Sequence, residues 1–172
     1  MLYVLDANVL ITARDQYYGF NMVPEFWDWL LHHAEAGTVK LPWEVIEEVS
    51  SGSDQKKGGD PLLDWVSDKE NRKKLDLGEA TFEYVSRVLN IGYSPDLTPE
   101  QVAIKQGDAF VLAHALVDPA GRCVVSNEVS QPRKAPHNRK LPDAARALNI
   151  RCINTFEFVR EMKFCTMWKL LL

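Results

Sequence analysis

The stretch that decides the fold is YVLDANVLI, residues 3–11, near the start of the chain. The apolar run over residues 2–5 predicts a short buried strand, and Asp6 and Asn8 follow where that strand ends. A carboxylate at the end of a buried strand destabilises the fold unless a partner compensates for its lost hydration. We therefore expect Asp6 to meet a partner from a distant part of the chain.

The composition is that of one compact globular domain. The chain has 172 residues, of which 46% are hydrophobic and 26% are charged, so it can bury a substantial core. We expect a single domain over residues 1–172, with an apolar tail over residues 156–172. The net charge of -4 argues against a general nucleic-acid coat, although a local basic patch can still attract phosphates to an acidic enzyme.

The three cysteines, Cys123, Cys152 and Cys165, form no CxxC pair and are odd in number. This favours reduced thiols in a cytoplasmic protein over a disulfide framework or a zinc site. No segment approaches the roughly 18 uninterrupted apolar residues that a membrane span needs. The sequence thus predicts a cytoplasmic protein without a membrane partner.

Short apolar strands alternate with amphipathic helices along the chain. We expect helices from Pro24 to Gly37, over 43–50 and over 62–69, a polar glycine-rich loop between the last two, and a helical pattern over 78–89. Thr98 and Pro99 predict a helix start, and a further helix is expected to begin at Gly107, with Asp108 in its first turn. Strands over 122–128 and 150–154 and helices over 141–149 and 155–162 complete the series. This alternation predicts a three-layer α/β/α domain with a mainly parallel sheet, whose ligands gather at the carboxyl ends of the strands.

Acidic residues recur at the expected ends of elements. They are Asp6, then Glu47 and Glu48 in the expected helix over 43–50, Asp108, and Glu128 after the first residues of the strand that begins at residue 122. Clustered carboxylates raise one another's pKa, and a divalent cation makes such a cluster tolerable. Oxygen ligands without a Cys or His set favour Mg²⁺ or Mn²⁺ over zinc. Any one of these acids alone is better explained as a solvated charge or a helix cap, so the prediction rests on their combined placement.

Four segments in this order carry a resemblance to a known family. YVLDANVLI, EVIEEV, GDAFVLAHAL and VVSNE together resemble the PIN-domain family of metal-dependent ribonucleases, many of which are VapC-like toxins of bacterial toxin–antitoxin pairs. FWDWL and KLPDAARALNIRC further resemble a little-characterised PIN subfamily. The resemblance covers nearly the whole chain and implies a PIN-like α/β/α fold.

The resemblance also implies which residues form the site. Asp6, Asp108 and Glu48, which we choose over Glu47 because an aliphatic residue follows it, would hold a Mg²⁺ or Mn²⁺ ion. The family's last motif is a hydroxyl residue, Asn and an acid, at Ser126, Asn127 and Glu128. Glu128 would support this ion or bind a second one. It stands where Asp is more usual, so a second metal site is less secure than the first. Asn8 would orient the loop or a metal-bound water, and a metal-activated water would attack RNA phosphorus.

Basic and aromatic residues near these motifs have two interpretations each. Arg133, Lys134, Arg139 and Lys140 form either an RNA phosphate clamp or a solvated loop, and neither is favoured. Lys56 and Lys57 are fainter candidates for the same role. Tyr17, Tyr18 and Phe20 could stack on unpaired bases, but core packing is favoured. For Asp143, a helix-start role is favoured over a catalytic one.

The leading interpretation is a metal-dependent endoribonuclease that acts as the toxin of a toxin–antitoxin pair. One alternative is a non-catalytic PIN-like module that binds RNA or protein. Another is a phosphatase of the haloacid dehalogenase type, which is disfavoured because Asn8 cannot transfer the proton that an Asp transfers there. An exposed apolar tail would mark an interface with an antitoxin or with a second copy in a homodimer.

Overall fold

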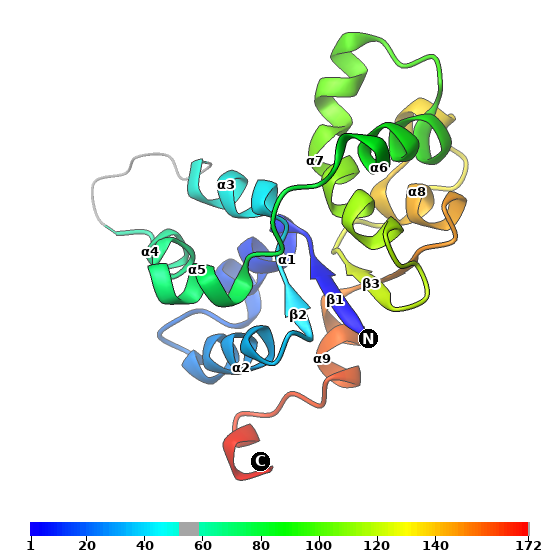
Figure 1. Cartoon of the computed structure of the whole chain (residues 1–172). Helices are drawn as coiled ribbons and strands as arrows, with labels where there is room; N and C mark the ends of the chain where they lie inside the picture. The colour runs from blue at the N-terminus through cyan, green and yellow to red at the C-terminus, as the bar shows by residue number, and fades with distance from the viewer. Residues whose placement is uncertain (52–58, 172) are drawn as a thin grey trace.

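The computed structural model describes residues 1–51 and 59–171 (Figure 1). Residues 52–58, which include Lys56, Lys57 and most of the predicted glycine-rich loop, lie outside the described residues, as does Leu172. No helix in the described part of the chain is long and apolar enough to cross a membrane. All three cysteines are free thiols, and Cys123 is buried in the sheet.

A four-stranded, all-parallel sheet forms the centre of the fold. Its strands are β1 (Leu2–Leu5), β2 (Val39–Lys40), β3 (Arg122–Val125) and β4 (Arg151–Ile153), in the order β2-β1-β3-β4. Leu5 is paired in register with Val125, and Val125 with Ile153. Three strands therefore end side by side, and the residues that follow them emerge at one edge of the sheet. The predicted α/β class with a mainly parallel sheet is confirmed.

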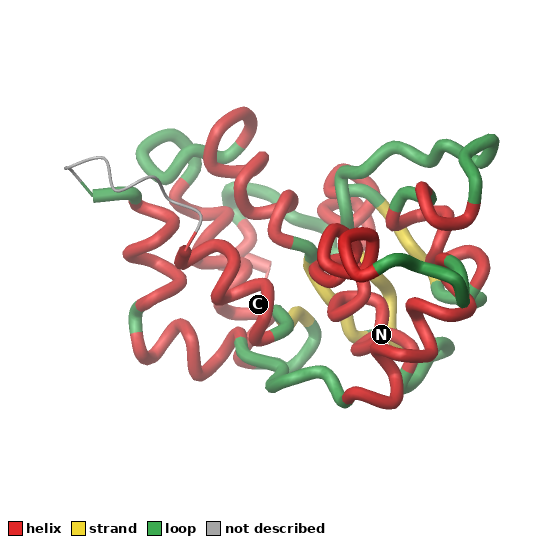
Figure 2. The backbone as a smooth tube through the Cα atoms, turned by 90° about the horizontal axis from the view of Figure 1, so that it is seen from above, coloured by secondary structure: helices red, strands yellow, loops and turns green. Residues whose placement is uncertain are grey.

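Helices lie on both sides of this sheet (Figures 1 and 2). α2, for example, begins at Pro24, a residue suited to the first helical position, and ends before Gly37, whose φ of 74° suits a helix C-terminus. The α-helices are α1 (Ala7–Thr12), α2 (Pro24–Glu35), α3 (Trp43–Ser51), α4 (Pro61–Ser67), α5 (Lys69–Leu75), α6 (Phe82–Arg87), α7 (Pro99–Leu116), α8 (Leu141–Ala147) and α9 (Thr155–Glu161). Two π-helices, η1 (Ala13–Tyr17) and η2 (Val88–Tyr93), continue α1 and α6, and two 3₁₀ turns are η3 (Pro136–Asn138) and η4 (Trp168–Leu171).

One expectation about Asp108 is wrong. The sequence predicts a helix break at Gly107, but α7 runs without interruption from Pro99 to Leu116. Thr98 starts it with a capping box, in which the side chains of Thr98 and Gln101 bond to each other's backbone N–H. A single glycine inside a helix costs about 1 kcal/mol, too little to end a well-capped helix. Asp108 therefore lies in the middle of α7 instead of at a helix start.

Two other predicted helices have different bounds. The segment expected to be one helix over 62–69 belongs to two helices, α4 and α5, because Asp68 adopts a non-helical conformation and accepts hydrogen bonds from the backbone N–H of Glu70 and Asn71. The pattern over 78–89 becomes helical only at Phe82 and then continues as η2 to Tyr93. Local helix propensity alone does not show where these helices begin and end.

Two of the three early aromatic residues pack on the core, as favoured from the sequence. The Tyr18 ring stacks on Phe26 with 4.3 Å between centroids, and the Phe20 ring stacks on Trp27 at 3.9 Å. Tyr17 is 42% exposed. Core packing thus accounts for Tyr18 and Phe20.

The C-terminal tail docks on its own domain. In α9, Phe158 is fully buried. Beyond α9, the indole Nε1 of Trp168 donates to the carbonyl oxygen of Glu25 in α2 at 3.1 Å, and its side chain is buried. Leu170 and Leu171, by contrast, are exposed. The tail is therefore anchored through Trp168, while its last described residues leave apolar surface in contact with water.

Replacing Trp168 with Ala is expected to lower the free energy of unfolding by about 2 kcal/mol, because a large buried ring and a hydrogen bond are lost at the edge of the core. Leu170→Ala is the matched control and should change it by less than about 0.5 kcal/mol, as for other exposed positions. Urea unfolding followed by tryptophan fluorescence and circular dichroism measures both. Equal effects of the two substitutions would contradict the docking of the tail through Trp168.

Candidate metal centre

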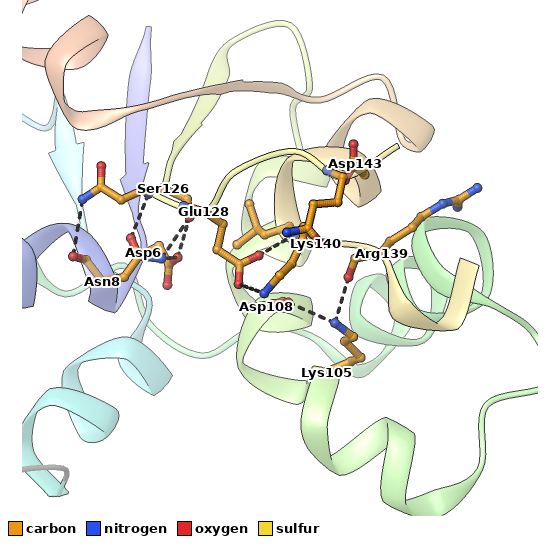
Figure 3. Close-up of polar contacts among 12 residues, drawn as sticks. Asp6, Asn8, Lys105, Asp108, Ser126, Glu128, Arg139, Lys140 and Asp143 are labelled. Atoms are coloured by element: carbon orange, nitrogen blue, oxygen red, sulfur yellow. Dashed lines mark hydrogen bonds and ion pairs between the residues drawn. The ribbon is translucent and has the colours of Figure 1, made fainter. Parts of the chain in front are cut away.

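Asp6 is held at the end of β1 by two donors. Its backbone N–H bonds to the carbonyl oxygen of Val125 at 3.0 Å. The hydroxyl of Ser126 donates to Asp6 Oδ2 at 2.8 Å, and the Asn8 side-chain amide donates to the same oxygen. Asp6 precedes α1, yet its side chain does not cap that helix. Its carboxylate is therefore oriented by neighbours from β3 and α1 and faces the edge where the strands end (Figure 3).

Asn8, Ser126 and Asn127 join the ends of β1, β3 and β4. Asn8 Oδ1 accepts a hydrogen bond from the Asn127 backbone N–H at 2.9 Å, while its Nδ2 donates to Asp6 and to Ser126. Asn127 Oδ1 in turn accepts from the Thr155 hydroxyl at 2.8 Å. The three residues predicted to support the site thus form one network. Thr155 was not predicted, although it directly follows the Asn154 cap at the end of the fourth strand.

The two adjacent acids of α3 point in different directions. Glu47 Oε1 accepts from the Arg72 guanidinium at 2.6 Å, on the side of α5. Glu48 lies against α7, since a Cβ on Gly107 would be 3.6 Å from Glu48 Oε2. Gly107 is the neighbour of Asp108. The packing of α3 on α7 therefore brings Glu48, the acid chosen from the sequence, close to Gly107, the residue before Asp108.

Asp108 is positioned by two residues that sequence analysis did not identify. The Tyr93 hydroxyl donates to Asp108 Oδ2 at 3.0 Å, and Tyr93 is only 2% exposed. The Lys105 ammonium lies 4.0 Å from the same oxygen. The i, i+3 spacing of Lys105 and Asp108 was a usable signal. Tyr93 gave none, because the π-helix that presents it was not expected.

Glu128 has both carboxylate oxygens engaged. Its Oε1 accepts from the Lys140 ammonium at 2.9 Å, and its Oε2 accepts from the backbone N–H of Leu141 at 2.8 Å. Its own backbone N–H donates to Ser126 Oγ at 3.2 Å. Figure 3 shows Glu128 extending from the end of β3 towards Lys140 and Asp108.

These carboxylates perturb one another. Burial raises the pKa of Asp6 to about 7. The hydrogen bond from Ser126 opposes this rise, and the charges of Asp108, Glu48 and Glu128 add to it. Burial also raises the pKa of Glu48. The pKa of Asp108 is raised by burial and by Glu128, against the influence of Tyr93, Lys105 and Lys140. The other three predicted acids therefore all destabilise the negative charge of Asp6, and Glu128 also destabilises that of Asp108.

The chemistry of this cluster fits a hard divalent cation. All its acidic ligands are carboxylate oxygens, and in Asp6 and Asp108 the hydrogen bonds described above converge on Oδ2, which leaves Oδ1 as the oxygen to offer to a cation. In the described part of the chain, no three His, Cys, Asp or Glu side chains lie close enough together to form a complete metal-binding group. The acids therefore influence the charge of Asp6 without being grouped as closely as a complete set of metal ligands.

The four basic residues expected to bind RNA differ in their surroundings. Arg133 and Lys134 are exposed and line a surface cavity of about 390 Å³. Arg139 donates to the carbonyl oxygen of Gly92 in η2 at 2.8 Å, and Lys140 pairs with Glu128. The loop thus presents two exposed cations on its surface and directs Lys140 towards the acids.

Asp143 anchors this loop to α8. It is buried, and it accepts from the Ser130 hydroxyl at 2.5 Å and from the Gln131 backbone N–H at 2.6 Å. Burial alone would raise its pKa, but these hydrogen bonds and Arg146 lower it. Asp143 lies in the first turn of α8, which agrees with the helix-start role favoured from the sequence.

Comparison with known proteins gives one match. Residues 3–166 match the model of a family described as a domain of unknown function, DUF4411. No curated protein and no solved structure matches the chain. The match extends from β1 beyond α9, so it includes all four strands and every acid of the candidate metal centre. The chain belongs to the DUF4411 family.

Proposed function

We propose that this protein is a metal-dependent endoribonuclease of the PIN type, which hydrolyses phosphodiester bonds of RNA with Mg²⁺ or Mn²⁺. One observation carries the proposal. Asp108, Glu48 and Glu128, which come from three distant segments of the chain, all raise the pKa of Asp6 at the carboxyl edge of the sheet. A divalent cation bound at this edge would neutralise the repulsion between these carboxylates, which explains why a fold can place them there.

The residues have distinct tasks in this proposal. Asp6, Asp108 and Glu48 would hold the cation, which when bound lowers the pKa of a water and stabilises charge on the phosphate. Ser126 and Asn8 keep Asp6 in its orientation through hydrogen bonds to Oδ2. Tyr93 does the same for Asp108. Burial and Asp108 raise the pKa of Tyr93, so its hydroxyl remains a hydrogen-bond donor at any physiological pH.

Cleavage of a fluorescent, mixed-sequence single-stranded RNA by the purified protein tests the proposal. We expect cleavage with Mg²⁺ or Mn²⁺, none with EDTA, and none by the Asp6→Asn variant. An isosteric substitution keeps the hydrogen bond from Ser126 possible while removing the charge. Cleavage that persists in EDTA, or that Asp6→Asn leaves unchanged, would reject the proposal.

The toxin role is a second part of the proposal. It is supported by the resemblance of the motifs to toxin ribonucleases and by exposed apolar side chains, such as Leu170 and Leu171, that an antitoxin or a second copy of the chain could cover. Induced expression in bacteria should arrest growth, and Asp6→Asn should relieve the arrest. Normal growth despite active, soluble protein would argue against a toxin and leave the nuclease proposal intact.

A non-catalytic binding module is the second candidate, because both oxygens of Glu128 are engaged with Lys140 and Leu141. Its distinguishing outcome is RNA binding without cleavage under all metal conditions. Phosphatase activity of the haloacid dehalogenase type has less support, because Asn8 uses its side-chain oxygen and nitrogen within the network around Asp6. A covalent phosphate on Asp6 would revive it.

A further inference from the structure

Glu128 differs from Asp6 and Asp108 in how its oxygens are used. Lys140 and the Leu141 backbone N–H each bond to a separate oxygen of Glu128. In Asp6 and Asp108, the donors converge on a single oxygen, Oδ2. Each oxygen of Glu128 thus already accepts one hydrogen bond, whereas the hydrogen bonds named here leave Oδ1 of Asp6 and of Asp108 as the more accessible oxygen for a cation.

Two lysine ammonium groups lie beside two of the acids, Glu128 and Asp108. Lys140 reaches Glu128 from the start of α8. Lys105 extends from α7, lies 4.0 Å from Asp108 Oδ2, and donates to the carbonyl oxygen of Arg139 at 2.8 Å. The Lys105 side chain is only 12% exposed, and its ammonium is 5.1 Å from the centre of the Tyr93 ring. Figure 3 shows both lysines directed towards the Asp108 and Glu128 side of the cluster.

The charges of this arrangement match one divalent cation. Asp6, Glu48, Asp108 and Glu128 carry four negative charges when ionised, and the ammonium groups of Lys105 and Lys140 carry two positive ones. The remaining two negative charges are those that a single Mg²⁺ or Mn²⁺ would neutralise. In two-metal nucleases a second ion lies about 3.5–4 Å from the first and stabilises the phosphate oxygens from the other side.

We infer that Glu128 anchors Lys140 instead of binding a second metal ion, and that Lys140 binds the RNA phosphate beside a single divalent cation, with Lys105 adding positive charge next to Asp108. This inference rests on the proposed nuclease function. It accounts for the Glu at a position where the resemblance leads one to expect Asp, because the longer side chain reaches Lys140 and Leu141. Lys140 would contact the phosphate, while Lys105, which is more buried, supplies positive charge next to Asp108.

Metal stoichiometry tests the first half without any assay of activity. Calorimetric titration of the intact protein with Mn²⁺ should give one site. Glu128→Gln should keep the Mn²⁺ affinity within about threefold, whereas Asp108→Asn, the matched removal of one charge, should weaken it more than about tenfold. Two sites, or equal losses in the two variants, would overturn the assignment of Glu128.

RNA binding in EDTA tests the second half. Lys140→Met should weaken binding of single-stranded RNA and reduce the salt dependence of log K by about 0.7, the value for one phosphate contact on a single strand. Lys140→Arg should restore both, which excludes a general folding defect. Lys169→Met is the control, because Lys169 pairs with Asp28 near the tail. An unchanged slope for Lys140→Met, or no RNA binding by the wild type, would overturn this half.

The outcomes separate the inference from the proposed function. If the protein binds one Mn²⁺ ion and Lys140→Met reduces the salt dependence of RNA binding, but no RNA is cleaved, the roles inferred for Glu128 and Lys140 hold and the nuclease proposal is rejected. Cleavage together with two Mn²⁺ sites would sustain the nuclease and reject the inference.

Discussion

Asp108→Asn is expected to reduce the rate of RNA cleavage by about 10³-fold or more. A metal site supplies several kcal/mol of transition-state stabilisation, and a loss of about 4 kcal/mol corresponds to a factor of about 10³ in rate. The Asn side chain can still accept the hydrogen bond from Tyr93, so the substitution removes charge while α7 stays in place. Single-turnover cleavage at saturating Mg²⁺ measures this loss.

Asp118→Asn is the matched control for that variant. Asp118 follows α7, is exposed, and accepts from the Gly121 backbone N–H at 3.0 Å, a bond that Asn can also accept. It should cleave RNA at the wild-type rate and unfold at the same urea concentration. Similar rates for Asp108→Asn and Asp118→Asn would show that the charge of Asp108 has no part in catalysis.

The second large effect is on stability. In the absence of divalent ions, Asp6→Asn should make the protein more stable than the wild type at pH 8.5, by about 2–4 kcal/mol. The pKa of Asp6 is raised from 3.8 to about 7 in the folded protein, and one pKa unit corresponds to about 1.4 kcal/mol. Ionised Asp6 therefore destabilises the folded state at high pH, and Asn carries no such charge.

The direction of the pH dependence follows from the raised pKa. Below about pH 4, Asp6 is protonated in both the folded and unfolded states, and the wild type should match Asp6→Asn. As the pH rises from 4 through 7, the unfolded chain loses this proton first, so the stability that proton binding contributes is lost. The difference between the two proteins should therefore grow over this interval and level off above about pH 8.

Urea unfolding of both proteins at several pH values, in EDTA and in saturating Mg²⁺, measures this difference. Mg²⁺ should remove most of the difference by which the wild type is less stable than Asp6→Asn, because a ligand that binds only the folded state stabilises it. Asp60→Asn provides a control of opposite sign. Burial would raise the pKa of Asp60, but the Leu62 backbone N–H and Arg14 lower it overall, so Asp60 stabilises the folded protein above pH 4. Parallel pH curves for wild type and Asp6→Asn would contradict the raised pKa.

Three of the four strands could be recognised from the sequence because strands of a parallel sheet are covered on both faces and appear as short apolar runs; the two-residue strand β2 was not predicted. β1 begins and ends at the residues predicted, Leu2 and Leu5, and β3 and β4 lie within the predicted ranges. Helix boundaries were less predictable. Gly107 did not end α7, because the capping box at Thr98 and the continuous burial of residues beyond Asp108 outweigh the low helix propensity of one glycine.

The acids of the candidate site could be chosen from the sequence because each follows a strand or lies in a recognisable motif. The choice of Glu48 over Glu47 agrees with the structure, in which Glu47 pairs with Arg72 and Glu48 lies against α7. Tyr93 and Lys105 were not found. Tyr93 meets Asp108 through a π-helix that no local pattern predicts, and Lys105 depends on the loop that supplies the Arg139 carbonyl.

The sequence by itself determined the α/β class and three of the four strands of the sheet, and it singled out the acids proposed for the site. These depend on local hydrophobic periodicity and on the rule that parallel strands end at one edge. Only the tertiary structure decided which oxygens of Asp6, Asp108 and Glu128 are engaged, and that Lys140 pairs with Glu128. The Lys140–Glu128 and Ser126–Asp6 contacts join residues 12 and 120 positions apart, and such contacts depend on how helices and loops pack, which no local stretch of sequence encodes.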